Sequence, residues 1–263
     1  MQVRDSVVVV TGAGRGIGAA LARRFAAEGA AGIVVSDVNG DSAAAVAAEL
    51  GGNSVAVAAD VTDAAQVAAL VTAAESHFGP VDLFCSNAGV AFGRGMDASP
   101  ADWATNLNVN LMAHVHAANA ALPSMLSRGR GYFLNTASAA GLLMSPGDAP
   151  YNVSKHAAVA FAEWLSATYG DQGIGVSVLC PMGVRTDMLM PGIEQGETAA
   201  LAVAAFGDIL EPAAVASVVI DGLAAEQFHI LPHPEVATFL QRKASDIDRW
   251  LSGMRRATAQ LPR

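Results

Sequence analysis

The chain has 263 residues, of which 52% are hydrophobic and 15% charged, and this balance indicates a globular rather than a disordered protein. Its formal net charge of −9 argues against nucleic-acid binding, because a phosphate-binding surface needs clustered lysine and arginine side chains. We expect a cytoplasmic protein that does not contact membranes, because the chain enters a strand pattern without a signal-like segment and no apolar run reaches about 18 residues.

Short apolar runs alternate with helical patterns along the whole chain. The apolar runs predict strands at residues 7–10, 32–36, 55–59, 81–86, 132–136, 175–180 and 228–231. Helical patterns occupy residues 19–28, 41–50, 64–78, 99–127, 150–169, 211–225 and 235–257. Continuously apolar strands are buried on both faces, and repeated strand–helix units produce a parallel sheet covered by helices. The pattern therefore predicts an α/β fold with a doubly wound, seven-stranded parallel sheet of the Rossmann type.

We expect residues 1–263 to form a single dinucleotide-binding and catalytic domain, since no linker, repeat or low-complexity tract divides them. Residues 235–257 would form a C-terminal helical extension of that domain. The segment 191–205 carries Gly192 and Gly196 between two well-formed elements. It is interpreted either as a mobile cover of the active site or as an ordinary surface loop.

A glycine-rich turn links the first strand to the first helix. Its sequence, TGAGRGIG at residues 11–18, fits T-G-x-x-x-G-x-G rather than G-x-G-x-x-G, because Ile17 stands where the third glycine would be. Glycines permit a tight turn and the close approach of a phosphate, and the helix N-terminus supplies free N–H groups and a positive dipole. The turn therefore predicts a site for the pyrophosphate of a dinucleotide. The cofactor-binding residues predicted here are Gly12, Arg15, Gly16, Ile17 and Gly18.

Asp37 ends the second predicted strand. A carboxylate at this place accepts hydrogen bonds from the adenosine ribose hydroxyls and repels a 2′-phosphate, which favours NAD over NADP. Arg15 supplies a cation in the same region that would tolerate such a phosphate, so NADP remains the second choice. The alternative interpretation of Asp37 is a helix-capping or loop aspartate.

Tyr151 and Lys155 are four residues apart in a predicted helix, so they share one face of it. A tyrosine has a reference pKa of about 10. A nearby ammonium and a positively charged nicotinamide would lower this pKa, and the phenol would then act as a general acid–base. Such a pair also arises by chance in many helices. Ser138 supports a catalytic role for the pair, because it follows the fifth strand, at the sheet edge where ligands bind. Its hydroxyl can donate a hydrogen bond to a substrate oxygen.

In their order and spacing, these motifs resemble the short-chain dehydrogenase/reductase family over residues 5–190. The other matching pieces are Asp60-Val61, Asn87-Ala88-Gly89, Asn110, the YNVSK sequence at 151–155 and PMGVRT at 181–186. Two features depart from the family pattern. Ser86 stands where an asparagine is common, and the usual glycine-rich close after the last strand is replaced by FHILPHP at residues 228–234.

The resemblance implies a nicotinamide-dependent oxidoreductase. Tyr151 would be the acid–base group, and Ser138 would steady the substrate oxygen. Lys155 would bind the nicotinamide ribose and lower the pKa of the tyrosine, and Asn110 would help to hold a proton-relay water. The family also implies a homotetramer, with a homodimer as the next choice.

The resemblance implies further contacts with the cofactor. Asp60 and Val61 would lie along the adenine, and the segment Asn87-Ala88-Gly89 would support the cofactor from the fourth strand. Val184 and Thr186 would meet the nicotinamide carboxamide after Pro181. Taken singly, these residues have structural alternatives, such as core amides for Asn87 and Asn110 and a helix cap for Thr186.

Three segments should border the substrate pocket, namely 92–96, 139–144 and 182–190. Their large apolar side chains are Phe92, Met96, Leu142, Leu143, Met144, Met182, Met188, Leu189 and Met190. They predict an adaptable apolar pocket that suits a hydrophobic secondary alcohol or ketone better than a sugar or a carboxylate. Arg94 is the alternative anchor for an acid.

The function that we expect is hydride transfer between NAD(H) and such an alcohol or ketone. The alternatives are an NADP-preferring carbonyl reductase, or an epimerase or dehydratase on the same fold. A cofactor-binding regulator without turnover would be expected to lose Tyr151 or Lys155, and the chain retains both.

The remaining candidate residues have structural interpretations. Cys85 and Cys180 lie in apolar runs and are predicted to be buried thiols. His229 and His233 lack a third ligand, so we predict no metal site. The C-terminal helix should pack its apolar stripe on its own sheet or on a neighbouring subunit, and a place for Trp250 in the substrate pocket is the alternative. That stripe consists of Val236, Phe239, Leu240, Ile247, Trp250, Leu251 and Met254.

Overall fold

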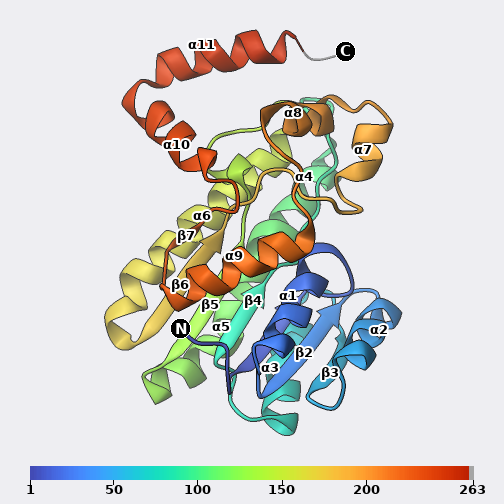
Figure 1. Ribbon diagram of the computed structural model, residues 1–263, viewed down its shortest axis with the longest axis vertical. Helices are drawn as coiled ribbons and strands as arrows, with labels where there is room; N and C mark the ends of the chain where they lie inside the picture. The colour runs from blue at the N-terminus through green and yellow to red at the C-terminus, as the bar shows by residue number, and fades with distance from the viewer. Residues whose placement is uncertain (261–263) are drawn as a thin grey trace.

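The computed structural model describes residues 1–260, and at their centre lies a seven-stranded parallel sheet (Figure 1). In chain order the strands are β1 (Val7–Thr11), β2 (Gly32–Asp37), β3 (Ser54–Ala58), β4 (Leu83–Ser86), β5 (Gly131–Thr136), β6 (Ile174–Leu179) and β7 (His229–Ile230). Their order in space is β3-β2-β1-β4-β5-β6-β7, so the direction of winding reverses between β1 and β4. This confirms the predicted doubly wound, Rossmann-type sheet, and a reversal of this kind creates a ligand crevice at the carboxyl ends of the strands.

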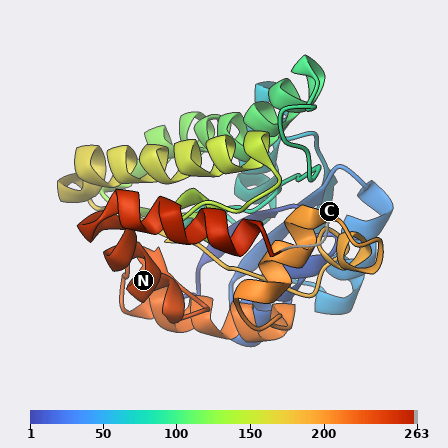
Figure 2. The same cartoon turned by 90° about the horizontal axis from the view of Figure 1, so that it is seen from above.

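Helices cover both faces of the sheet (Figures 1 and 2). One face packs against α1 (Gly16–Ala27), α2 (Gly40–Leu50) and α9 (Pro212–Ala224). The other packs against α3 (Ala64–His77), α5 (Ala113–Arg128) and α6 (Ala149–Tyr169). The buried sides of these helices are rich in alanine, whose small side chain lets a helix lie close to a sheet. The inner strands β1, β2, β4, β5 and β6 are almost wholly buried, as their continuous apolar runs predict, whereas the edge strand β3 is half-buried.

The helical zone predicted at 99–127 consists of three pieces. Helix α4 (Pro100–Leu107) starts with a reciprocal cap between Ser99 and Asp102. A single π-helical turn at Asn108–Met112 then joins it to α5. Such a turn inserts an extra residue into the helix, and here it directs Asn110 into the interior, where its side chain is fully buried.

Two predictions about the later part of the chain are wrong. The surface-loop interpretation of residues 191–205 is wrong, because α7 (Met190–Glu194) and α8 (Thr198–Phe206) occupy most of this segment, and both helices line the cleft, as the alternative of an active-site cover requires. Residues 235–257 are two helices, α10 (Glu235–Ser245) and α11 (Ile247–Thr258), rather than one. Asp246 separates them with an extended backbone, and its carboxylate accepts the N–H of Arg249 at 2.9 Å, so it caps α11 instead of continuing α10.

Candidate active site

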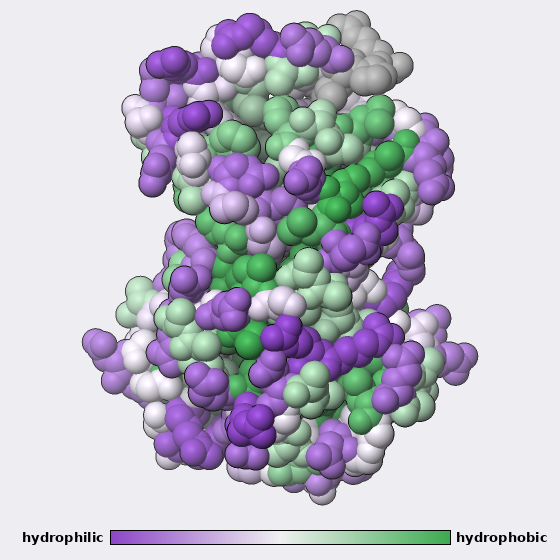
Figure 3. All heavy atoms as spheres, in the orientation of Figure 1, coloured by the Kyte–Doolittle hydropathy of each residue, from purple (hydrophilic) through white to green (hydrophobic). Residues whose placement is uncertain are grey.

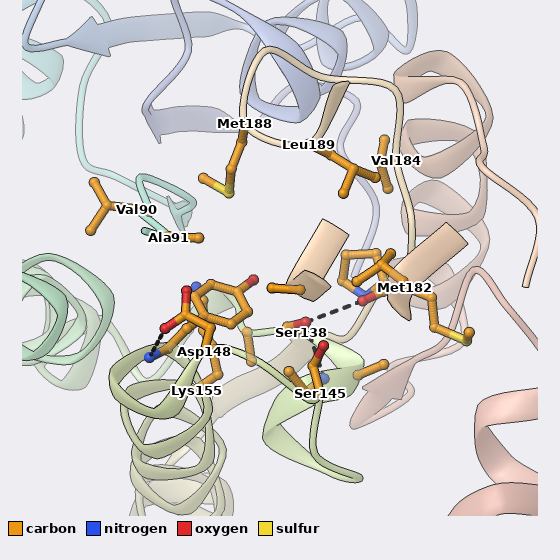
Figure 4. Close-up of a pocket in the computed structure, with 18 of the residues that line it drawn as sticks. Val90, Ala91, Ser138, Ser145, Asp148, Lys155, Met182, Val184, Met188 and Leu189 are labelled. Atoms are coloured by element: carbon orange, nitrogen blue, oxygen red, sulfur yellow. Dashed lines mark hydrogen bonds between the residues drawn. The ribbon is translucent and has the colours of Figure 1, made fainter. Parts of the chain in front are cut away.

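A cleft of about 1650 Å³ opens at the carboxyl ends of the strands. Most small-molecule pockets measure roughly 300–1,000 Å³, so this cleft has room for a dinucleotide together with a substrate. Its walls come from the glycine-rich turn, from the ends of β2, β4, β5 and β6, and from α7, α8, α10 and α11. The space-filling view shows a mostly hydrophobic belt below the C-terminal helices, and the close-up shows part of the lining (Figures 3 and 4).

The glycine-rich turn closes one end of the cleft. Gly12 and Gly16 have φ angles of +61° and +55°, values that side chains with a Cβ adopt rarely. Helix α1 then starts with no side-chain cap and no acidic residue in its first turn. Within residues 1–260, the N–H groups of Gly16 and Ile17 donate to no protein acceptor. Free amides and a positive helix end fit a pyrophosphate group.

Gly18 has a different role from the predicted one, because it does not line the cleft. It is buried at the start of α1, where the carbonyl of Gly12 packs directly against its Cα. Any side chain at this position would collide with that carbonyl. Gly18 therefore shapes the turn and does not face the cofactor site.

Asp37 lies at the end of β2 and lines the cleft, as the sequence predicts. Its carboxylate accepts the N–H of Gly14 and the N–H of Asn39, both at 3.0 Å. Asp37 therefore also has the alternative role of a loop aspartate, because its hydrogen bond with Gly14 stabilises the glycine-rich turn. Arg15 turns its guanidinium towards Asp187, at 3.5 Å, and both side chains are largely exposed.

Ser138, Tyr151 and Lys155 line the same part of the cleft. Tyr151 and Lys155 share one face of α6, where the Lys155 Nζ lies 5.7 Å from the centre of the Tyr151 ring. Ser138 follows β5, and its Oγ accepts the N–H of Ala140 at 3.1 Å. Figure 4 shows Ser138 and Lys155 on one side of the pocket, with Met188 and Leu189 on the opposite side. The structure thus brings together the three side chains that the sequence predicted as catalytic.

Burial determines the pKa values in this group. It raises the pKa of Tyr151 above its ordinary value, a hydrogen bond from Ser138 opposes the increase, and the charge of Asp148 adds to it. Burial also lowers the pKa of Lys155 to about 8. The expected lowering of the tyrosine pKa by Lys155 is therefore not produced by the protein's own groups. The Nζ donates instead to the carbonyl of Thr136, at 2.9 Å.

Asn110 is buried behind the cleft and does not line it. Its Oδ1 accepts the N–H of Val90 at 2.9 Å, and its Nδ2 donates to the Val90 carbonyl at 2.9 Å and to the Ser154 Oγ at 3.0 Å. The side chain therefore ties the segment after β4 to α6, next to Lys155. These bonds make Asn110 a positioning residue for α6 and the β4 end.

The other predicted cofactor residues line the cleft from several elements. They are Asp60, Val61, Asn87, Ala88, Gly89, Pro181, Val184 and Thr186. Asn87 also holds the fold together here, because its Nδ2 donates to the Thr11 carbonyl at 3.1 Å and its Oδ1 accepts from the Thr136 hydroxyl at 3.1 Å. Gly89 leaves room for Lys155, since a Cβ at this position would lie 3.4 Å from the Nζ.

The predicted apolar lining is correct in part. Six of the nine side chains line the cleft, namely Phe92, Leu143, Met144, Met182, Met188 and Leu189. Met96, Leu142 and Met190 do not, and Met96 is 96% exposed. Arg94 also lies outside the lining, where it pairs with Asp102 at 3.0 Å.

Further walls come from distant parts of the chain, and the sequence offers residues 191–205 and Trp250 only as alternatives for them. Val203 and Phe206 of α8 line the cleft together with Phe239 of α10. Trp250 of α11 lies among them, with its ring centre 6.2 Å from that of Phe239, so the alternative that placed it in the pocket holds. Only the three-dimensional path of the chain brings these side chains to the cleft.

Asp148 is a second residue that the sequence analysis missed. It is buried at the N-terminus of α6, where its Oδ1 accepts the N–H of Tyr151 at 3.0 Å. Its Oδ2 accepts the N–H groups of Phe92 and Gly93 at 3.1 and 2.7 Å. The side chain therefore joins the segment 92–96, called the substrate loop below, to the catalytic helix α6. An aspartate three residues before Tyr151 is a helix-capping signal that could have identified it.

Cys85, Cys180 and His233 have the structural roles that the sequence predicts. Cys85 and Cys180 are buried free thiols. His233 is buried and accepts the N–H of Met182 at 3.1 Å through its Nδ1. Within residues 1–260, no three histidine, cysteine or acidic side chains are grouped as metal ligands. In the same described part of the chain, no helix combines the length and apolar character needed to span a membrane.

Comparison with known proteins gives the family. The model of the short chain dehydrogenase family matches residues 6–196. The chain belongs to the short-chain dehydrogenase/reductase family. It is therefore an oxidoreductase that uses a nicotinamide cofactor, which confirms the sequence-based prediction at that level.

Members of this family resemble the chain along different lengths. The 1-deoxy-11-beta-hydroxypentalenate dehydrogenase of Streptomyces exfoliatus is 38% identical, over 96% of this chain and 92% of that enzyme. The D-threitol dehydrogenase of Mycolicibacterium smegmatis is 37% identical, over 69% of this chain and 71% of that enzyme. A short-chain dehydrogenase/reductase from Burkholderia phymatum, solved in complex with NAD, superimposes with a TM-score of 0.83 and 34% identity, covering 94% of this chain and 96% of that one.

Proposed function

We propose that this enzyme transfers hydride between NAD(H) and an apolar secondary alcohol or ketone. The observation that carries the proposal is the convergence of Ser138, Tyr151 and Lys155 in a cleft that also contains the glycine-rich turn. The bound nicotinamide would accept or supply the hydride. The protein's own groups then have to hold the substrate oxygen and move one proton.

Tyr151 is the proposed proton carrier. In oxidation its phenolate oxygen takes the hydroxyl proton of the alcohol, and in reduction the neutral phenol returns a proton to the carbonyl oxygen. Ser138 donates a hydrogen bond to the same substrate oxygen and stabilises its negative charge. Lys155 would hold the nicotinamide ribose, and its ammonium group together with the positive nicotinamide would oppose the effect of burial on the pKa of Tyr151.

Asp37 is the basis for proposing NAD rather than NADP. It lies at the end of β2, beside the turn that fits the pyrophosphate, and no arginine or lysine is ion-paired with it in residues 1–260. A 2′-phosphate would be repelled by this carboxylate, and Arg15, the cation of the neighbouring turn, already faces Asp187 at 3.5 Å. The NAD complex of the Burkholderia phymatum relative supports the same choice.

The apolar lining supports a hydrophobic substrate. Relatives that match about 70% of the chain include enzymes named for small polyols, D-threitol and meso-2,3-butanediol. Three relatives that match 95–96% of it are named for a hydroxypentalenate, a hydroxy acid. We therefore propose a bulky secondary alcohol as the substrate.

A panel of secondary alcohols and ketones, assayed with both cofactors by absorbance at 340 nm, tests this proposal. We expect formation of NADH with large apolar alcohols and much slower turnover with short diols and sugars. Turnover of strongly polar substrates alone would contradict the substrate class. Conversion of a substrate without net NADH formation would favour an epimerase or dehydratase.

We also infer that the protein is a homotetramer, with a homodimer as the alternative. Val153 and Trp164 lie on the outer side of α6 and are 49% and 53% exposed. Large apolar side chains at the surface of one helix are suited to burial between subunits.

A further inference from the structure

The C-terminal helices contribute three arginines to the wall of the cleft, Arg242, Arg249 and Arg256, and the last of these donates to the Ser252 Oγ at 3.0 Å. Arg242 lies near the end of α10, and Arg249 lies in the first turns of α11. Both line the cleft, and both side chains belong to exposed residues.

Neither Arg242 nor Arg249 has a protein anion to neutralise it. Within residues 1–260, the guanidinium groups of Arg242 and Arg249 form no ion pair and no hydrogen bond with a carboxylate. Arg242 rests instead over the ring of Phe239, 5.9 Å from its centre. Arg15 and Arg94, in contrast, face Asp187 and Asp102 at 3.5 and 3.0 Å.

Six acidic residues line the cleft, namely Asp37, Asp60, Asp148, Asp187, Glu197 and Asp246. Asp187 faces Arg15, Glu197 precedes α8, and the other four accept backbone N–H groups. Asp37 and Asp148 accept backbone N–H groups of the glycine-rich turn and of α6. Asp60 accepts the N–H of Thr62 at 2.9 Å. Asp246 lies between the two arginines in sequence and accepts the N–H of Arg249 at 2.9 Å. An anionic ligand would therefore find the two guanidinium groups without a protein partner.

The helices that carry the arginines are fixed over the cleft. The Nζ of Lys243 donates to the Leu142 carbonyl at 2.6 Å, which ties α10 to the segment 139–144. Phe239 and Trp250 pack against the main hydrophobic core. Figure 2 shows α11 lying across the upper end of the molecule between α6 and the α8–α9 side. The arginines thus stand next to an aromatic wall of the cleft rather than on a free tail.

We infer that Arg242 and Arg249 bind a carboxylate on the substrate, at the end remote from the reacting hydroxyl. A guanidinium group matches a carboxylate through two parallel hydrogen bonds, and an exposed cation at a cleft entrance also attracts anions from solution. The substrate would then have an apolar body against Phe239 and Trp250 and an anionic end at the arginines. This inference rests on the proposed function. It refines the sequence-based expectation, in which a hydrophobic alcohol or ketone is a better substrate than a carboxylate.

The first experiment measures binding without turnover. Octanoate and octanamide are titrated by calorimetry into the NADH-saturated enzyme, into R242Q, R249Q and the double variant, and into R255Q as the control. Arg255 is an exposed residue of the same helix that does not line the cleft. We expect the acid to bind at least about tenfold more tightly than the amide in the unmutated enzyme and in R255Q, and this preference to vanish in the double variant. Equal affinities, absence of binding, or an unchanged preference in the double variant would overturn the inference.

The second experiment separates this inference from the proposed function. The kcat/KM values of 9-hydroxydecanoate and of its methyl ester are compared with NAD as the cofactor. We expect R242Q and R249Q to raise KM for the acid and to leave the ester unaffected. Turnover of the ester at the same rate as the acid would leave the proposed function standing and reject the role of the arginines. If neither compound is turned over but octanoate binding depends on the arginines, the role of the arginines stands and the proposed function is rejected.

Discussion

Tyr151 and Lys155 share a buried environment that favours the neutral form of each. The pKa of Tyr151 is raised, and that of Lys155 is lowered to about 8. The neutral phenol is the form that donates a proton to a carbonyl oxygen in the reductive reaction. The positive charge of an oxidised nicotinamide would favour the phenolate that oxidation needs.

Asp37→Ala should change the choice of cofactor. Removing the carboxylate removes its repulsion of a 2′-phosphate, so the ratio of kcat/KM for NADP to that for NAD should increase by about tenfold or more. The variant should also melt at a lower temperature, because the N–H of Gly14 loses its acceptor. Asp41→Ala, an exposed change in the first turn of α2, is the control. A preference of the unmutated enzyme for NADP would refute the proposed cofactor.

His114 should make the protein sensitive to acid. Burial, with a contribution from the charge of Lys155, lowers the pKa of His114 from 6.5 to about 3. The unfolded chain therefore binds a proton near pH 6.5 that the folded protein excludes until about pH 3. The contribution of His114 to the free energy of unfolding is fully present above pH 6.5 and is lost as the pH falls towards 3. Between pH 7 and pH 5 the loss is roughly 2 kcal/mol.

Urea unfolding of the unmutated protein and of His114→Gln, measured at pH 7 and pH 5, tests this expectation. The variant should lose less free energy of unfolding between the two pH values, whatever its absolute stability. His77→Gln, on the exposed side of α3, should keep the unmutated slope. Parallel pH profiles for the unmutated protein and His114→Gln would show that another group is responsible.

Helices and strands that are determined by a local sequence pattern are predicted accurately, and those that depend on the folded backbone are not. The strands were located within one or two residues, because a buried parallel strand is a continuous apolar run. The break at Asp246 was missed, since the apolar stripe continues through it and the cap on Arg249 requires a folded backbone. Gly192 and Gly196 precede helix α8, and glycines at such spacing favour a loop over a helix in the sequence.

The N-terminus of α6 depends on a single carboxylate. In Asp148→Ala the N–H groups of Tyr151, Phe92 and Gly93 lose their acceptor in a buried place. We expect the free energy of unfolding to fall by roughly 2–4 kcal/mol and kcat to fall as well, because both the catalytic helix and the substrate loop lose an anchor. Thermal melting and steady-state kinetics measure the two effects. Asp171→Ala, an exposed change beyond the other end of α6, should alter neither, and an equally stable D148A would contradict this assignment.

At the scale of the whole molecule, the sequence indicated the catalytic group more completely than the substrate pocket. Ser138, Tyr151 and Lys155 belong to one strand end and one helix, so their order in the chain reports their proximity. The walls from α8, α10 and α11 come from segments that begin 43 residues or more after Lys155, and their local pattern offers a place at the cleft only as an alternative. The role of Asn110 was only implied by family resemblance, since the π-helical turn that directs it inward has no simple sequence signal.

The proposed tetramer can be tested on α6. Trp164 is 53% exposed and stacks on Phe161, with ring centres 6.1 Å apart. Trp164→Glu would place a charge in the expected interface, so light scattering after gel filtration should show a smaller assembly than for the unmutated protein. Thr72→Glu, an exposed change on α3, should leave the assembly intact. An unmutated protein that is monomeric would contradict the proposal directly.

The measurement that tests the central claim most directly compares Tyr151→Phe with Tyr169→Phe in turnover and in NADH binding. Tyr169 ends the same helix, outside the cleft, and so controls for the loss of one hydroxyl. We predict that Tyr151→Phe reduces kcat by a factor of about 10²–10⁴ or more while NADH binds with nearly unchanged affinity, and that Tyr169→Phe behaves like the unmutated enzyme. Full activity of Tyr151→Phe would contradict the account, because the phenol would then not be the group that moves the proton.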